Sequence, residues 1–148
     1  MARRRRKTDD SAPLPSAFVK RQVPFHDVDA MRIVWHGNYL KYFEMARDQL
    51  CSDFGVDMYG YGEETPIVYP VIRTSTRHSH PLRHGDVFLC TVTLVEARTK
   101  LILDYEIELA DSGTLCATGR TEQVGLSMPD LELQLRLPSS LRRAFGIE

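Results

Sequence analysis

The sequence has no apolar run long enough to cross a bilayer, and its basic N-terminus lacks the apolar stretch that follows in a secretory signal. These absences argue against a membrane-spanning segment and against export, so we expect a cytoplasmic protein with no membrane partner. The 148 residues are 43% hydrophobic and 26% charged, as in ordinary globular domains, and suffice for one core. A single domain over residues 17–148 is therefore predicted.

Cysteine is scarce, and its spacing excludes two classes of site. Cys51, Cys90 and Cys116 are odd in number, far apart and set among apolar neighbours, without a C-x-x-C pair or a disulfide framework. Reduced thiols in the core of a cytosolic protein are the expected outcome.

Excess charge of either sign is also missing, since the formal net charge is −1. The one basic run, Arg3 to Lys7, lies beside Asp9 and Asp10 and is typical of a solvated, mobile tail, which we place at residues 1–16. The chain beyond that tail is mildly acidic, so binding to nucleic acid is not expected.

One long helix and several strands are predicted from the periodicity. Residues 18–25 favour a short strand, and Pro24 near its end indicates an edge or a bulge because proline cannot donate to a central ladder. A helix stopped by Gly55 is predicted over 38–54, where apolar residues recur at helical spacing: Leu40, Phe43, Met45, Ala46, Leu50 and Phe54.

The second half of the chain favours β structure and ends in a short helix. Strands are predicted at 67–79, 87–97, 101–110 and 114–126, and their short connections favour antiparallel neighbours. Pro138 suits the first turn of a final helix. The predicted class is α+β, with a curved antiparallel sheet of about five strands wrapped around one long central helix.

The stretch "FHDVDAMRIVWHGNY", residues 25–39, is open to three interpretations. In the first it is a polar turn in which the aspartates and Asn38 bind nearby amides, with Gly37 or Asn38 near the helix N-cap. In the second, a carboxylate acts as nucleophile or general base beside free amides at the helix start. The third is a zinc or non-haem iron site built from His26, Asp27, Asp29 and His36, whose spacing matches no known metal motif.

A second histidine-rich stretch, "RHSHPLRH", precedes the predicted strand at 87–97. His78 and His80 would share one face of a strand, with His84 nearby, and could bind zinc, although no cysteine accompanies them. Alternatively, Arg77, Arg83 and His84 could meet the phosphates of a ligand at a strand end, or be merely solvated.

The longer stretch "FHDVDAMRIVWHGNYLKYFEMAR" resembles the signature of the 4-hydroxybenzoyl-CoA thioesterase branch of the hotdog-fold family. The segment "HPLRHGDVF" resembles the Pro-x-Arg-x-x-Asp turn of that family, so the likeness covers roughly residues 18–137. This resemblance implies a hotdog fold and hydrolysis of acyl-CoA or acyl-carrier-protein thioesters without a metal or redox cofactor. It also implies a homodimer that pairs two sheets edge to edge, or a dimer of such dimers.

The resemblance assigns roles residue by residue. Asp29 matches the catalytic carboxylate, and His36 matches a position that orients substrate or water. Asn38 and Tyr39 match positions that shape the substrate site, with structural roles as an alternative. Asp27 is most simply a residue that stabilises the loop.

Arg32 departs from the pattern, which has glycine at this position. If that glycine adopts a positive φ, a side chain there adds strain or narrows the site. Arg32 is therefore a candidate for contact with a ligand phosphate or with a carrier protein, or else a side chain that points outward. Arg83 is a candidate for binding the phosphates of CoA.

A single carboxylate suits thioester chemistry. The carbonyl is electrophilic and the thiolate leaves readily, while an aspartate with the reference pKa of about 3.9 is ionised at pH 7. It can attack the carbonyl or activate a water, and both routes stay open. A hotdog protein that binds acyl-CoA or an acyl-carrier protein without turnover is the alternative. A hotdog dehydratase is less consistent, because it relies on a differently placed histidine. The loop "YGYGEETP" is a candidate lining for the acyl pocket.

Overall fold

The computed structural model describes residues 13–59 and 66–147, and the α+β class is confirmed. The predicted basic tail and the predicted acyl-pocket loop lie largely outside these residues. Helices and strands follow in the order β1 (Ser16–Gln22), η1 (Phe25–Asp27), α1 (Asn38–Phe54), β2 (Ile67–Val68), β3 (Val71–His78), β4 (Val87–Glu96), β5 (Leu101–Leu109), β6 (Leu115–Gln123), β7 (Gly125–Ser127), β8 (Glu132–Gln134) and α2 (Ser139–Ala144).

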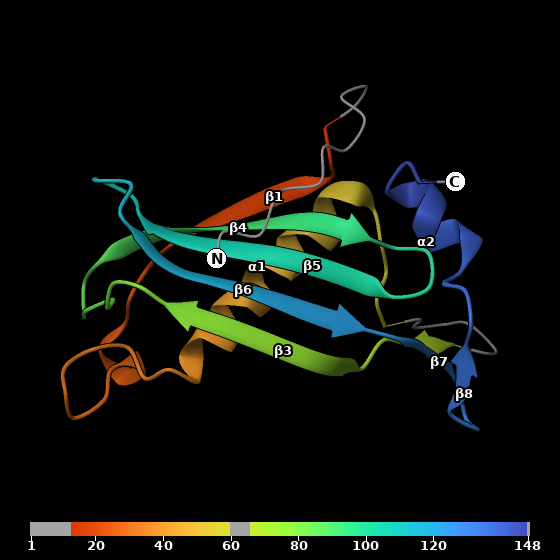
Figure 1. Ribbon diagram of the computed structural model, residues 1–148, viewed down its shortest axis with the longest axis horizontal. Coiled ribbons are helices and arrows are strands. Elements are labelled where there is room, and N and C mark those ends of the chain that lie inside the picture. Colours follow the sequence, from red (N-terminus) through yellow and green to blue (C-terminus); the bar gives the residue numbers. More distant parts are fainter. Residues whose placement is uncertain (1–12, 60–65, 148) are drawn as a thin grey trace, which may run out of the picture.

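The main sheet has five antiparallel strands in the order β1-β4-β5-β6-β3, with α1 packed behind it (Figure 1). β1 lies at one edge, as Pro24 indicated. The predicted helix 38–54 is confirmed at both ends, and Gly55 ends it with a left-handed backbone at φ +66°.

One predicted neighbour relation is wrong. Short connections favoured pairing between consecutive strands, yet β3 pairs with β6 at the far edge, and β4 pairs with β1 instead. Residues 79–86 therefore carry the chain from β3, at one edge of the sheet, past β6 and β5 to β4, which lies next to the opposite edge strand β1. The connection length could not reveal this, because β1 already occupies the edge of β4 that β3 was expected to take.

The core lies between α1 and the sheet. The buried face of α1 consists of Tyr39, Tyr42, Phe43, Ala46, Leu50 and Cys51. Leu40 was expected on this face but is 37% exposed, because the buried stripe is rotated toward the two tyrosines. Helix and sheet approach closely at Gly119 of β6, where a Cβ would lie 2.3 Å from the ring of Phe43. The helix–sheet distance therefore depends on this glycine.

A second, three-stranded sheet was not predicted. It has the order β2-β7-β8, and it forms because the predicted strands 67–79 and 114–126 are each interrupted, at residues 69–70 and at Val124. Pro70 has no N–H to donate, which favours a break at that point. β8 follows a turn and has exposed leucines on either side, so its sequence gave little sign of a strand.

The three thiols agree with a further expectation. Cys51, Cys90 and Cys116 are buried and free, as predicted. No helix in the described part of the chain is both long and apolar enough to span a membrane.

Candidate active site

The loop at residues 25–37, between β1 and α1, folds back on itself as a tight turn. The Asp29 N–H donates to the Ile33 carbonyl at 2.9 Å, and the Arg32 N–H donates to the Asp29 carbonyl at 2.9 Å. The Asp29 Oδ1 accepts a hydrogen bond from the Met31 N–H at 2.8 Å. An aspartate that binds the amide two residues on is a common way to fix a turn, and here it fixes the carboxylate itself.

This 25–37 loop is anchored to the segment that enters β4. The Val34 N–H donates to the Leu82 carbonyl at 2.8 Å, and Ile33 forms an antiparallel bridge with Arg83. The Arg83 N–H is in turn held by the Asp86 carboxylate at 2.9 Å. The structure thus brings the backbone of Arg83 beside the loop that carries Asp29, while its side chain stays exposed.

Asp27 ties the loop to the first turns of α1. Its carboxylate is only 2% exposed and accepts hydrogen bonds from the Lys41 ammonium at 2.5 Å and the Tyr42 hydroxyl at 2.6 Å. Its carbonyl accepts two more, from the Trp35 N–H at 3.0 Å and the Asn38 side-chain amide at 2.8 Å. Three of these four bonds join Asp27 to α1, and the bond from Trp35 ties the two ends of the loop to each other.

The pKa of the Asp27 carboxyl follows from its surroundings. Burial alone would raise the pKa of Asp27, but hydrogen bonds from Lys41 and Tyr42, together with the charges of Lys41 and His26, lower that pKa below its usual value. Burial and the neighbouring carboxylate raise the pKa of Tyr42. Asp27 is therefore a structural anion with its oxygens occupied, consistent with a loop-stabilising role.

Asp29 differs from Asp27 in its surroundings. It is partly exposed, and within the residues that the structure describes no donor is placed on its second carboxylate oxygen. The hydrogen bond to Oδ1 therefore orients the carboxylate, and Oδ2 is available to a substrate or a water. Such an arrangement suits a group that must approach a reacting carbonyl or a water.

The amides at the helix start are only partly free. The N–H groups of Asn38 and Tyr39 donate to the carbonyls of Trp35 and His36 at 2.9 and 3.3 Å, so these two amides are not the free donors that were expected. Over the described ranges, the N–H groups of His36 and Gly37 donate to no backbone carbonyl. A Cβ at Gly37 would lie 2.3 Å from the ring of Trp35, so this corner admits only glycine without rearrangement.

Tyr39 and His36 lie at the same end of the molecule with different exposure. Tyr39 is buried, its hydroxyl accepts a hydrogen bond from the Leu82 N–H at 3.4 Å, and burial raises its pKa. Its ring meets the ring of His78 edge-on, with 4.5 Å between centroids. His36 is exposed, and its ring centroid lies 5.2 Å from that of Trp35.

Arg32 has the positive φ that was considered for a position where the family has glycine. Its φ is +64°, in the left-handed region where glycine is favoured, and its side chain is exposed. A side chain in this region costs about 1 kcal/mol relative to an unstrained backbone. The positive φ on which the expected strain depended is thus present, and the exposed side chain agrees with the outward-pointing alternative.

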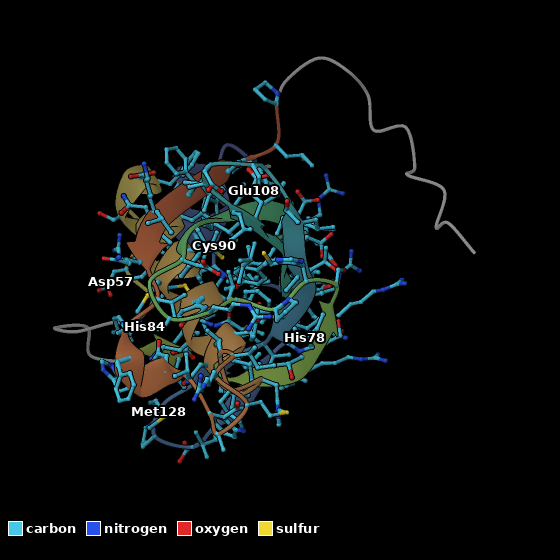
Figure 2. All side chains as sticks on the ribbon, turned by 90° about the vertical axis from the view of Figure 1, so that its left-hand side faces the viewer. Asp57, His78, His84, Cys90, Glu108 and Met128 are labelled. Atoms are coloured by element: carbon cyan, nitrogen blue, oxygen red, sulfur yellow. The ribbon has the colours of Figure 1, made fainter. Side chains whose placement is uncertain are left out.

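The histidines do not gather into a metal site. Figure 2 looks onto the end where α1 begins, with His78 and His84 on opposite sides of it. His84 packs against Phe25 at 5.6 Å between ring centroids, whereas His78 contacts Tyr39. Within residues 13–59 and 66–147, no three His, Cys, Asp or Glu side chains are grouped as metal ligands would be.

Two contributors, Lys41 and Tyr42, were missed from the sequence. For Lys41, only its position in the first turn of the helix could have suggested contact with the loop. Lys41 also borders a cavity of about 900 Å³ that runs along α1 beside the small sheet, with Met45, Cys51, Val68 and Gln123 among its lining residues. This cavity starts next to the Asp27 network and has room for an acyl group.

The chain matches a family model described as the thioesterase-like superfamily over residues 23–145. It is 25% identical over 118 residues to a 1,4-dihydroxy-2-naphthoyl-CoA hydrolase of Thermosynechococcus vestitus. This alignment covers 79% of this chain and 80% of the relative.

Solved structures of hotdog thioesterases have the same fold. A 1,4-dihydroxy-2-naphthoyl-CoA thioesterase from Synechocystis superposes with a TM-score of 0.74 at 22% identity, over 88% of this chain and 95% of that one. A mutant 4-hydroxybenzoyl-CoA thioesterase bound to 4-hydroxybenzoyl-CoA superposes with a TM-score of 0.78 at 14% identity, over 89% and 99% of the two chains. The predicted hotdog fold is thus confirmed. With its fold and sequence in agreement, the chain belongs to the thioesterase-like superfamily, and its enzyme class is thioester hydrolase.

Proposed function

We propose that this protein hydrolyses acyl-CoA thioesters with Asp29 as the working carboxylate. The observation that supports this most is the state of Asp29, whose one oxygen is fixed by the Met31 amide while the other has no donor among the described residues. Relatives named for CoA thioesters favour CoA over a carrier protein as the thiol component. The reaction needs only water and the thioester, so the proposal includes no metal or redox cofactor.

Asp29 can serve by either of two routes. As general base, it takes a proton from water while the water oxygen bonds to the thioester carbonyl carbon. The tetrahedral intermediate then breaks its C–S bond, and the CoA thiolate takes up the proton to leave as the thiol. As nucleophile, Asp29 bonds to the carbonyl carbon and expels the thiolate, and water then cleaves the resulting anhydride to regenerate the carboxylate.

The developing oxyanion needs donors near Asp29. The N–H groups of His36 and Gly37 are candidates, because neither is used by a backbone carbonyl in the described residues. They lie where the dipole of α1 is positive, and a single donor of this kind is typically worth about 10²- to 10³-fold in rate. The His36 side chain would orient the water or the thioester.

The remaining candidates are given binding roles. Asn38 and Tyr39 hold the loop and the Leu82 segment in place and so define the mouth of the site. Arg83 and Arg32 present exposed guanidinium groups beside the loop, suited to the phosphates of CoA.

The alternative is an acyl-CoA-binding hotdog protein without efficient turnover. Arg32 favours it, because a strained arginine replaces glycine next to the carboxylate. A carrier protein in place of CoA is a second variant of the same proposal, since both present a phosphopantetheine thioester.

We further propose a homodimer formed through β3, or a dimer of such dimers. β3 is an edge strand of eight residues with no buried side chain, and Val71 and Ile72 at its start are exposed. An unprotected edge of this length is a template for pairing with another strand. A second copy would continue the sheet. The three free, buried thiols fit a cytoplasmic location for the dimer.

The test is thiol release from a panel of aryl-CoA, alkyl-CoA and acyl-carrier-protein thioesters. We expect Asp29→Asn to lower kcat by about 10²-fold or more with little change in KM. Asp111→Asn is the matched control. Asp111 also accepts a hydrogen bond from a nearby backbone amide, that of Ser112 at 2.7 Å, but it belongs to the β5–β6 turn and should keep the parent rate.

Undiminished release by Asp29→Asn would overturn the catalytic assignment. No release by the parent on any thioester, combined with tight acyl-CoA binding in calorimetry, would establish the binding alternative instead.

A further inference from the structure

The cavity along α1 contains an arginine that is largely withdrawn from solvent. The Arg47 side chain is 17% exposed and lines this cavity together with the buried Gln123. Within the residues that the structure describes, its guanidinium group makes one hydrogen bond, of 3.3 Å to the Gln123 Oε1, and one ion pair, of 3.6 Å with Glu44. A guanidinium group has five N–H donors, and burying its charge is costly unless they are used. Arg47 can therefore bind a further acceptor in the cavity.

Gln123 fixes the direction of this guanidinium group. Its side-chain NH₂ donates to the Tyr69 carbonyl at 2.8 Å, so its Oε1 is the atom that faces Arg47. Gln123 is only 2% exposed and ends β6, so both its side chain and its backbone are held. The arginine is thus oriented against the cavity wall by the protein itself.

The one carboxylate that the described residues pair with Arg47 is a weak partner. The Glu44 side chain is 65% exposed, and its oxygen lies 3.6 Å away, beyond the usual length of a hydrogen bond. Ion pairs of this kind on a helix surface contribute little, because water screens them. A carboxylate brought into the cavity would therefore displace Glu44 at small cost.

The other charged groups of the cavity do not neutralise Arg47. Lys41 is already bound to the Asp27 carboxylate. Asp48 and Asp57 are exposed, so their charges are screened by solvent. The cavity is thus acidic at its solvent-exposed rim and positive at the more deeply placed guanidinium group.

The positive charge lies beside an apolar part of the same cavity. Apolar side chains in its lining include Met45, Cys51, Val56, Met58 and Val68. Burial raises the pKa of Cys51 to about 11, and the charge of Arg47 opposes that rise, so the field of the arginine reaches these side chains. A ligand that is apolar along its length and anionic at its end would match both features.

We propose that this cavity selects acyl groups that end in a carboxylate, which Arg47 binds through its N–H donors while Gln123 positions the guanidinium group. The inference rests on the proposed function, because it concerns the acyl part of the same thioester. A carboxylate fits better than a neutral oxygen, since it matches the planar guanidinium fork in both shape and charge. Arg47 lies about 9 Å further along α1 than Lys41, so several carbons must separate the thioester from the carboxylate.

Binding to the Asp29→Asn protein measures this selectivity without turnover. Two matched pairs of CoA thioesters differ at the far end of the acyl group: adipyl-CoA against hexanoyl-CoA, and 4-carboxybenzoyl-CoA against 4-methylbenzoyl-CoA. In calorimetry we expect the carboxylate to lower Kd by about 10- to 100-fold in at least one pair. Equal Kd values within both pairs would overturn the inference.

Arg47→Met, made in the same background, tests the residue. Methionine keeps an unbranched apolar stem without the charge, so the preference for the carboxylate should disappear while binding of the methyl-ended thioesters changes little. Arg120→Met is the matched control. Arg120 is also a hydrogen-bonded arginine, paired with Asp104 at 2.7 Å, but it follows Gly119, which faces Phe43 of α1, and so lies on the opposite face of the sheet. This control should keep the preference.

Glu44→Gln decides the question if Arg47→Met does not fold. The Glu44 side chain is exposed, so the substitution should leave the fold intact. Removal of the competing carboxylate should tighten binding of the carboxylate-ended thioester by about two- to fivefold and leave its methyl-ended partner unchanged. No change in either thioester, or the same change in both, would contradict binding at the guanidinium group.

The outcomes separate this inference from the proposed function. If the parent releases thiol but neither binding nor rate distinguishes carboxylate from methyl ends, the inference is wrong and the thioesterase proposal stands. A carboxylate preference that depends on Arg47, in a protein that releases no thiol from any thioester, supports the inference and refutes the enzyme.

Discussion

Replacing Asp27 by asparagine should destabilise the protein more than any other isosteric change in the loop. Asparagine keeps one acceptor for the Tyr42 hydroxyl but turns an NH₂ group toward the Lys41 ammonium, so that two donors face each other. The Tyr42 bond is fully buried, and loss of its charged acceptor should cost about 1.5–2 kcal/mol. Lys41 is 42% exposed, and solvent screening limits its share to about 0.5–1 kcal/mol.

The expected total for Asp27→Asn is therefore about 2–3 kcal/mol in the free energy of unfolding. Urea unfolding measures this free energy with two signals. Circular dichroism follows the secondary structure, and the fluorescence of Trp35, the only tryptophan, follows the loop, because the Trp35 amide donates to the Asp27 carbonyl. We expect intermediate losses for Tyr42→Phe and the smallest for Lys41→Met. A loss for Asp27→Asn of about 0.5 kcal/mol or less, within the range of ordinary surface changes, would refute this reasoning.

Three further outcomes are expected. The pKa of Asp27 in the folded state lies below its unfolded value of 3.8, so this carboxylate stabilises the fold above pH 3.8 and loses that contribution as the pH falls through the pKa of the folded state. Acid titration should therefore destabilise the parent more steeply than Asp27→Asn. Arg32→Gly should be more stable than Arg32→Ala by about 1 kcal/mol in denaturant unfolding, since only glycine removes the strain at φ +64°, and equal stabilities would contradict that account. Gly119→Ala should lower the melting temperature through the clash with Phe43, whereas Ala110→Gly serves as a control for backbone entropy and should have a smaller effect.

The parts of the fold that depend on local information were predictable. The bounds of α1 follow from apolar spacing and from the glycine that ends it, and the edge position of β1 follows from one proline. The turn at Asp29 was one of the interpretations of its motif, and the glycine usual at the position of Arg32 raised the question of a positive φ there. Each of these is decided by residues within a few positions of one another.

The parts that depend on distant residues were not predictable. β3 and β6 are about 45 residues apart in the chain, and nothing in either strand specifies the other as its partner. Likewise, Asp27 looked like any loop aspartate, because its partners Lys41 and Tyr42 lie on a separate element. The burial of Asp27 and its contact with the charge of Lys41 become apparent only once the loop and α1 are placed together in the fold.

The strand order also governs how the molecule assembles from the unfolded chain. Within the five-stranded sheet that the described residues form, only β4–β5 and β5–β6 join strands that are consecutive in sequence. β1 meets β4 across more than 60 residues, as from Gln22 to Val87. Closing such long loops is slow, so we expect the central hairpins to form first and both edges to join late. The loop with Asp29 and the strand β3 depend on those edges. Substitutions there should therefore accelerate unfolding while leaving the refolding rate nearly unchanged, and a nascent chain should acquire its carboxylate site only after its core.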